Sequence, residues 1–189
     1  MKINQNLQGV AIRPSWDEYF MLLAKLAATR STCLSRPTGA VIVLEKQVLS
    51  TGYNGSMPGA PHCSDEGRCY RRSMKVFDEG KYDFCRSSHA EANAIAQAAR
   101  NGIPIKGATI YCTLLPCYTC TKLLASAGIK KIVYELGYDS LNKERDAYWV
   151  NEIRQAGIEL QQLQLSEHIM NLASRFISQT TSKRLLRSE

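Results

Sequence analysis

The sequence predicts an α/β fold. Apolar, β-branched runs alternate with segments of helical period, and several of the predicted helices carry recognisable start or stop residues. The chain has 189 residues, which is enough to bury a core without covalent cross-links. We expect one main domain over residues 1–165, followed by a helical, basic tail over 166–189.

The first helix is predicted from its capping residues and its apolar spacing. Ser15 can cap the helix, and Glu18 follows three residues later, as in a capping box. Four apolar positions recur at helical spacing and are expected to face the core. They are Trp16, Phe20, Leu23 and Ala27.

A β-hairpin is predicted next, from two short β-rich runs at 40–44 and 47–51, and residues 52–59 are turn-forming. From Pro61 to Ser88 neither a helical nor a strand period dominates, and this stretch holds three of the cysteines. An irregular segment of that length needs some other means of being held, and a metal ion is the usual one.

The second half of the chain alternates helices with strands, which favours a mostly buried sheet. Gly102 and Gly128 provide stop signals for the first two of these helices. The predicted helices cover 89–100, 117–127, 142–155 and 166–177, and the predicted strands cover 109–113, 131–134 and 158–163.

Composition indicates where in the cell the protein is located and which class of ligand it binds. No apolar run is long enough to span a bilayer, and the polar first ten residues lack the pattern of a signal peptide, so we expect a cytoplasmic protein that binds no membrane. Seven cysteines, an odd number, argue against a disulfide framework and favour metal binding or catalysis. The net charge of +7 suits an anionic ligand such as a nucleotide, although a solvated surface and a basic tail explain part of it.

Two short fragments carry the candidate chemistry: His89-Ala90-Glu91 and Pro116-Cys117-Tyr118-Thr119-Cys120. Cys117 and Cys120 lie three residues apart at a helix start, so both sulfurs share one face and the helix N-terminus favours their thiolate forms. His89 opens another helix and can supply a third ligand. Three protein ligands leave the fourth tetrahedral position to water, which is the pattern of a catalytic zinc site.

Glu91 follows the histidine by two residues and is not expected to bind the metal. Zinc lowers the pKa of its water to about 7, and a neighbouring carboxylate can take that proton and pass it to the reacting groups. Taken singly, these residues have ordinary explanations: a polar helix start, an exposed acid and a pair of small core residues. Their joint pattern favours the zinc site.

The same fragments match the H-x-E and P-C-x-x-C signature of zinc deaminases. Further stretches between Arg13 and Leu163 resemble the deoxycytidylate (dCMP) deaminases, including late-competence-type bacterial members and their phage relatives. These stretches are Arg13–Phe20, Arg30–Cys33, Gly52–Gly55, His62–Cys63, Cys85–Ala94 and Gly128–Tyr134.

The resemblance implies both a fold and an activity. The fold is a three-layer α/β/α sandwich of the cytidine-deaminase type with a mixed central sheet. The activity is zinc-dependent hydrolysis of dCMP to dUMP and ammonia, with Glu91 protonating the ring nitrogen N3, and it supplies dUMP for thymidylate synthesis. The family also implies a homo-oligomer, with a hexamer favoured, that dCTP activates and dTTP inhibits, with Mg²⁺ accompanying either effector. A phage member would work in its host's cytoplasm.

The resemblance also assigns substrate contacts. Asn54 matches the asparagine that hydrogen-bonds the sugar 3′-hydroxyl, although Asn-Gly is also a favoured turn pair. Arg36 is the expected phosphate contact or else a surface arginine, and Tyr138 lies near the substrate or packs in the core. Thr38 replaces the usual valine, and Ser87–Ser88 replaces the usual Gly-Val, so dCMP, dCTP and modified cytosine nucleotides all stay open.

Four further cysteines match the family's second metal site. Four thiolates without an open position form a closed, structural zinc site. The four are Cys33, Cys63, Cys69 and Cys85. Unrelated buried thiols are the alternative, and His62 can replace one of the ligands. Cys112 is expected to be a small core residue.

Three other functions share part of this evidence. A dCTP deaminase, or an enzyme that accepts both dCMP and dCTP, has the same zinc motif. A tRNA adenosine or DNA cytosine deaminase needs a basic, often aromatic surface for flanking nucleotides. This chain has a long cysteine-rich segment instead, so we expect no nucleic-acid partner. A non-catalytic zinc assembly factor has no use for Glu91.

Overall fold

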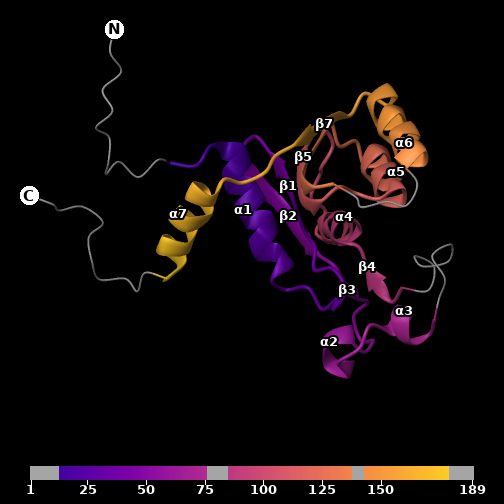
Figure 1. Ribbon diagram of the computed structural model, residues 1–189. Helices are drawn as coiled ribbons and strands as arrows, with labels where there is room; N and C mark the ends of the chain where they lie inside the picture. Colours follow the sequence, from indigo (N-terminus) through magenta and orange to yellow (C-terminus); the bar gives the residue numbers. More distant parts are fainter. Residues whose placement is uncertain (1–12, 76–84, 138–142, 179–189) are drawn as a thin grey trace, which may run out of the picture.

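A five-stranded mixed sheet forms the middle of the molecule (Figure 1). The computed structural model describes residues 13–75, 85–137 and 143–178. The strand order is β2-β1-β5-β6-β7, in which β1 is antiparallel to both neighbours and the last three strands are parallel. The strands are β1 Gly39–Leu44, β2 Gln47–Tyr53, β5 Thr109–Leu114, β6 Lys131–Leu136 and β7 Glu159–Gln162. A separate pair joins β3 Gly55–Ser56 to β4 Ser87–Ser88.

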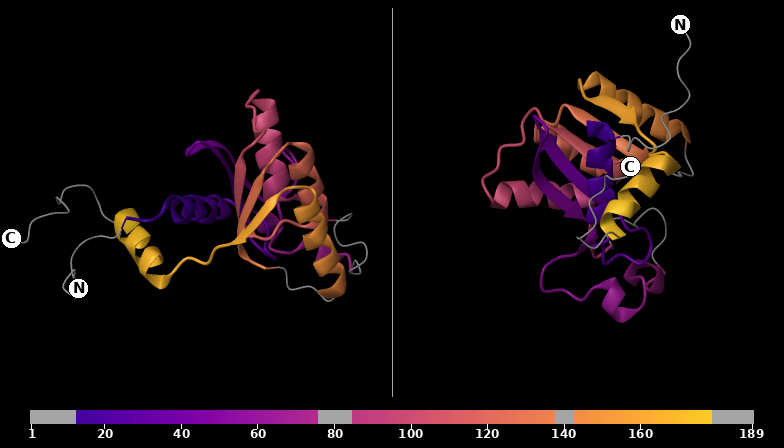
Figure 2. Two further views of the ribbon diagram at one scale, coloured as in Figure 1. Left: turned by 90° about the horizontal axis from the view of Figure 1, so that it is seen from above. Right: turned by 90° about the vertical axis from the view of Figure 1, so that its left-hand side faces the viewer.

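Helices cover both faces of this sheet (Figure 2, left). One face carries α1 Trp16–Ala28, with α7 Glu167–Ser178 beyond it, and the other carries α4 Ala90–Arg100, α5 Tyr118–Ser126 and α6 Lys143–Gln155. This arrangement confirms the predicted three-layer sandwich with a mixed sheet. None of the helices in the described part of the chain has the length and apolar character needed to cross a bilayer.

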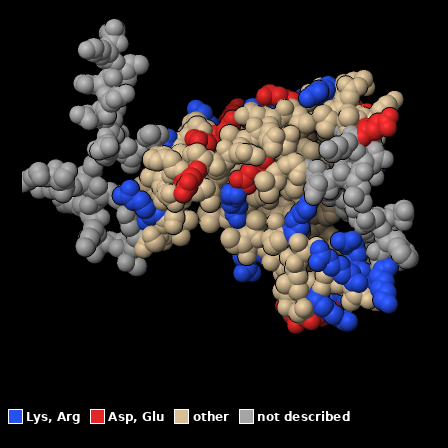
Figure 3. All heavy atoms as spheres, in the orientation of Figure 1, with Lys and Arg blue, Asp and Glu red and all other residues tan. Residues whose placement is uncertain are grey.

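Two single-turn helices lie at one end of the sheet, beside β3 and β4 (Figure 1). They are α2 Cys63–Glu66 and α3 Tyr70–Ser73. Lysine and arginine side chains gather over the α3 region, at the lower right of Figure 3.

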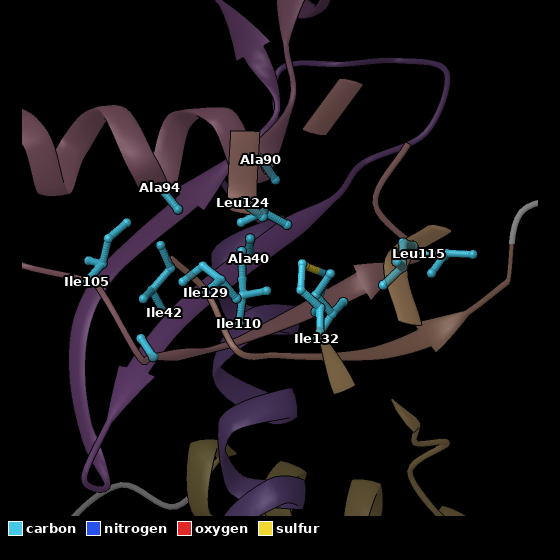
Figure 4. Packing of buried hydrophobic residues seen from close by; sticks show 14 of the residues in the cluster. Ala40, Ile42, Ala90, Ala94, Ile105, Ile110, Leu115, Leu124, Ile129 and Ile132 are labelled. Carbon is cyan, nitrogen blue, oxygen red and sulfur yellow. The ribbon is translucent and has the colours of Figure 1, made fainter. Parts of the chain in front are cut away.

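Side chains of β1 alternate between two core clusters, as a strand buried on both faces requires. Ala40 and Ile42 point into the cluster beneath α4, α5 and α6 (Figure 4), whereas Val41 and Val43 contribute to the cluster beneath α1. Helix α4 packs closely on β2, because a Cβ at Gly52 would lie 2.0 Å from the carbonyl oxygen of Ala90. This close contact fixes the start of α4, where the candidate site lies.

Helix α1 begins with the predicted capping box. The Ser15 hydroxyl accepts from the Glu18 amide at 3.3 Å, and the Glu18 carboxylate accepts from the Ser15 amide at 2.7 Å. The predicted core face was partly wrong. Trp16 is 44% exposed and stacks on the Phe20 ring, because the stripe that meets the sheet is formed by Phe20, Met21 and Ala24.

Two further predictions need correction. Strand β2 runs to Tyr53, because its backbone pairs with β1 as far as Gly39, so the turn predicted at 52–59 begins later. The segment predicted to be irregular contains α2, α3 and β4, which are too short to show a period in sequence. The helix predicted at 166–177 is present as α7, and the division at residue 165 stays a prediction.

Candidate metal centre and active-site cavity

Three predicted ligands meet where two helices begin. His89 is the residue that precedes the first turn of α4, Cys117 holds the same position in α5, and Cys120 lies in the first turn of α5. The His89 Nδ1 atom lies 3.4 Å from the sulfur of Cys117 and 3.4 Å from that of Cys120. All three ligand atoms lie within 4.8 Å of one another.

These spacings fit a tetrahedral zinc ion. Zinc–sulfur bonds of about 2.3 Å and zinc–nitrogen bonds of about 2.0 Å place neighbouring nitrogen and sulfur ligands about 3.5 Å apart. The observed nitrogen–sulfur distances match this value without any rearrangement. Among the described residues, no second group of histidine, cysteine and acidic side chains is gathered as closely.

The two thiols differ in acidity because they share a hydrogen bond. The Cys120 thiol lowers the pKa of Cys117 to about 4, with a further contribution from His89. The same interaction and burial raise the pKa of Cys120. The pKa of His89 is raised, chiefly by its hydrogen bond with Cys117. The sulfur of Cys117 is therefore a ready metal ligand at neutral pH.

Glu91 lies in the first turn of α4, next to this cluster, and only 4% of it is exposed. Burial raises the pKa of its carboxyl to about 7. The residue lines a cavity of about 290 Å³ together with His89 and Cys117. The explanation of Glu91 as an exposed surface acid is therefore wrong.

Asn54 is a buried residue that organises the wall of this cavity. Its side-chain oxygen accepts from the Thr38 amide at 2.8 Å and from the Ser31 hydroxyl at 2.6 Å, and its amide nitrogen donates to the Arg36 carbonyl at 2.9 Å. It lacks the positive φ that a type I′ Asn-Gly turn requires. Asn54 thus holds the 36–38 segment at the cavity.

The other predicted substrate contacts divide into two groups. Arg36 and Thr38 both line the cavity, so the structure brings them near the candidate metal site. Tyr138 lies outside the described residues. A direct contact between any of these residues and a substrate stays a prediction.

The second cysteine set borders the same cavity. Its four members line the wall, and burial is the main cause of the raised pKa of Cys85. Their sulfurs do not meet the spacing that His89, Cys117 and Cys120 satisfy. The buried Nδ1 atom of His62 has no hydrogen-bond partner. A second zinc ion therefore stays a prediction, and Cys112 is fully buried as expected.

Three arginines that the sequence analysis did not single out also line the cavity. They are Arg71, Arg72 and Arg86. Two of them lie in α3, and charged residues in a segment without a period suggest only a solvated surface. The paired arginines that follow Cys69 and Tyr70 were the available signal, but only the folded chain brings them to the cavity.

Comparisons with known proteins agree with this geometry. The sequence model of the cytidine and deoxycytidylate deaminase zinc-binding region matches residues 14–136. ComE operon protein 2 of Bacillus subtilis is 40% identical over 164 residues, which cover 86% of this chain and 79% of the relative. The deoxycytidylate deaminase of Schizosaccharomyces pombe is 39% identical over 150 residues, which cover 79% of this chain and 44% of that enzyme. The chain thus spans less than half of the yeast enzyme's length.

A solved structure shows the same fold. The dCMP deaminase of cyanophage S-TIM5, in complex with dCMP and dUMP, has a TM-score of 0.62 and 27% sequence identity. The superposition covers 80% of this chain and 99% of the phage chain. The family model matches more than half of this chain, and the ligands of the zinc-binding motif lie together in the structure. This chain therefore belongs to the cytidine and deoxycytidylate deaminase family.

Proposed function

We propose that this chain hydrolyses dCMP to dUMP and ammonia. The observation that carries the proposal is the buried Glu91 beside the His89, Cys117 and Cys120 cluster, in a cavity whose described lining holds four arginines. The yeast relative is named a deoxycytidylate deaminase, and the cyanophage enzyme was solved with both dCMP and dUMP.

His89, Cys117 and Cys120 would hold the zinc ion. The ion, when bound, supplies an acidified water as nucleophile at neutral pH. Glu91 removes the proton of the attacking water, delivers it to the ring nitrogen N3 and later protonates the departing ammonia. Burial raises the pKa of this carboxyl to about 7, which suits a group that must both accept and donate a proton near neutral pH.

The remaining cavity residues orient the nucleotide. Asn54 and Thr38 form the wall that would contact the sugar, and Arg36 supplies a positive charge for the phosphate. Asn54 hydrogen-bonds the Thr38 amide and the Arg36 carbonyl, so it also fixes the positions of Thr38 and Arg36 in the cavity.

Substrate specificity is tested by measuring ammonia release from dCMP, dCTP, deoxycytidine and a cytosine-containing oligonucleotide side by side. We expect dCMP to have the highest kcat/KM. Higher activity on deoxycytidine or on the oligonucleotide than on both nucleotides would overturn the free-nucleotide function. A preference for dCTP would instead assign the chain to the dCTP-deaminase alternative.

We further propose that Cys33, Cys63, Cys69 and Cys85 hold a second, structural zinc ion, with His62 as a substitute ligand. Their common position in the lining of the cavity and the unpartnered His62 nitrogen support this proposal. The family resemblance also supports a cytoplasmic homo-oligomer that responds to dCTP and dTTP with Mg²⁺. Ammonia release with and without each effector, and the mass of the native protein in solution, test these two properties.

A further inference from the structure

The lining of the cavity carries more positive charge than catalysis at a neutral cytosine ring requires. Among the described lining residues four are arginines and one, Glu91, is acidic. The arginines differ in the contacts that they make within the protein. An arginine with protein partners has a structural role, whereas one without such partners is available to a ligand.

Arg86 is engaged within the protein. Its guanidinium donates to the Glu66 carboxylate at 2.9 Å and to the Pro61 carbonyl at 3.1 Å, and it lies 4.2 Å from the centre of the Tyr70 ring. These contacts join α2 to α3 beside β4. Arg86 therefore fixes the position of the two short helices.

Arg72 also has a partner within the protein. It donates to the Ser35 hydroxyl at 3.1 Å, which links α3 to the segment that Asn54 fixes. Helix α3 is thus attached on one side through Arg86 and on the other through Arg72. Arg72 is a positioning residue.

Arg71, between these two attachments, lines the cavity without a partner in the described part of the chain. It is half-buried, and among the described residues it makes no hydrogen bond or ion pair. A half-buried guanidinium with no counter-charge among the described residues is poised to bind an anion, and its planar donors match a phosphate group.

We infer that Arg71 binds the 5′-phosphate of the nucleotide and makes the site prefer a phosphate ester to the nucleoside. Arg36 contributes from the 36–38 segment of the lining, while Arg72 and Arg86 hold α3 so that Arg71 lines the cavity. This inference rests on the proposed function and adds the residue that selects the substrate class.

The test measures binding of dUMP and of deoxyuridine to the zinc-loaded chain by calorimetry. Arg71→Gln should weaken dUMP binding at least ~10-fold, equivalent to about 1.4 kcal/mol, and leave deoxyuridine binding unchanged. Arg68→Gln is the matched control, because Arg68 is 64% exposed in its side chain, pairs with Glu66 and does not line the cavity. It should change neither affinity.

Equal losses for both ligands, or no loss for dUMP, would overturn the inference. Zinc content and melting temperature report whether each variant is folded, and Arg71→Met, which keeps the apolar stem, gives the same comparison if Arg71→Gln is unstable. A parent chain that deaminates dCMP while Arg71→Gln and Arg71→Met bind dUMP normally refutes only the role of Arg71. A parent chain that neither deaminates dCMP nor distinguishes dUMP from deoxyuridine refutes the proposed function itself.

Discussion

Glu91 is a buried acid, 4% exposed, and its carboxyl interacts with two thiols and an imidazole. Burying a carboxyl is unfavourable unless its surroundings or its function compensate. The sequence located Glu91 through its spacing from His89 but could not show its burial. That burial depends on α4 packing against β2 at Gly52, a contact between segments far apart in the chain.

Replacing this carboxyl tests its role. Glu91→Gln should lower dCMP turnover by ~10²–10⁴-fold, the usual contribution of general acid–base catalysis. The zinc content should stay unchanged, because Glu91 is not one of the three gathered ligands. Glu45→Gln, at the exposed hairpin turn, is the control and should retain full activity. Near-normal turnover in Glu91→Gln would exclude it as the proton shuttle.

At the scale of elements, the long helices and central strands could be predicted because each has a period or a cap. The capping box at Ser15 and the stop at Gly128 are local signals that the fold preserves. Helices α2 and α3 have neither signal, because a single helical turn is shorter than one amphipathic repeat. Their positions depend on distant partners, such as the contact of Arg72 with Ser35, which sequence spacing does not show.

The α2–α3 segment also provides the test of a second zinc ion. The parent chain should contain about two zinc ions. Cys85→Ser should lose one of them and melt at a lower temperature, because metal binding at a structural site contributes to folding. Cys117→Ser should abolish activity while the chain stays largely folded. Cys112→Ala, a substitution in the buried core, should leave the zinc content unchanged.

One outcome would contradict the second zinc ion. One zinc ion per parent chain, together with a Cys85→Ser variant as stable as the parent, would mean that the four upstream cysteines are ordinary thiols.

At the scale of the whole molecule, the fold places its chemistry at one end of the sheet. The starts of α4 and α5 supply the candidate ligands, and α3 supplies arginines at the same cavity. The motif residues could be predicted because their spacing repeats a known pattern. The arginines of α3 could not, because their role follows from three-dimensional proximity alone.

The most direct test of this account is the titration of zinc into the metal-free chain while dUMP formation from dCMP is followed. The metal-free chain should form no dUMP, and activity should rise with added zinc to a plateau. Cys117→Ser, titrated in parallel, should stay inactive at every zinc concentration. A metal-free chain that forms dUMP as fast as the zinc-loaded chain, or a zinc-loaded chain that forms none, would contradict the account.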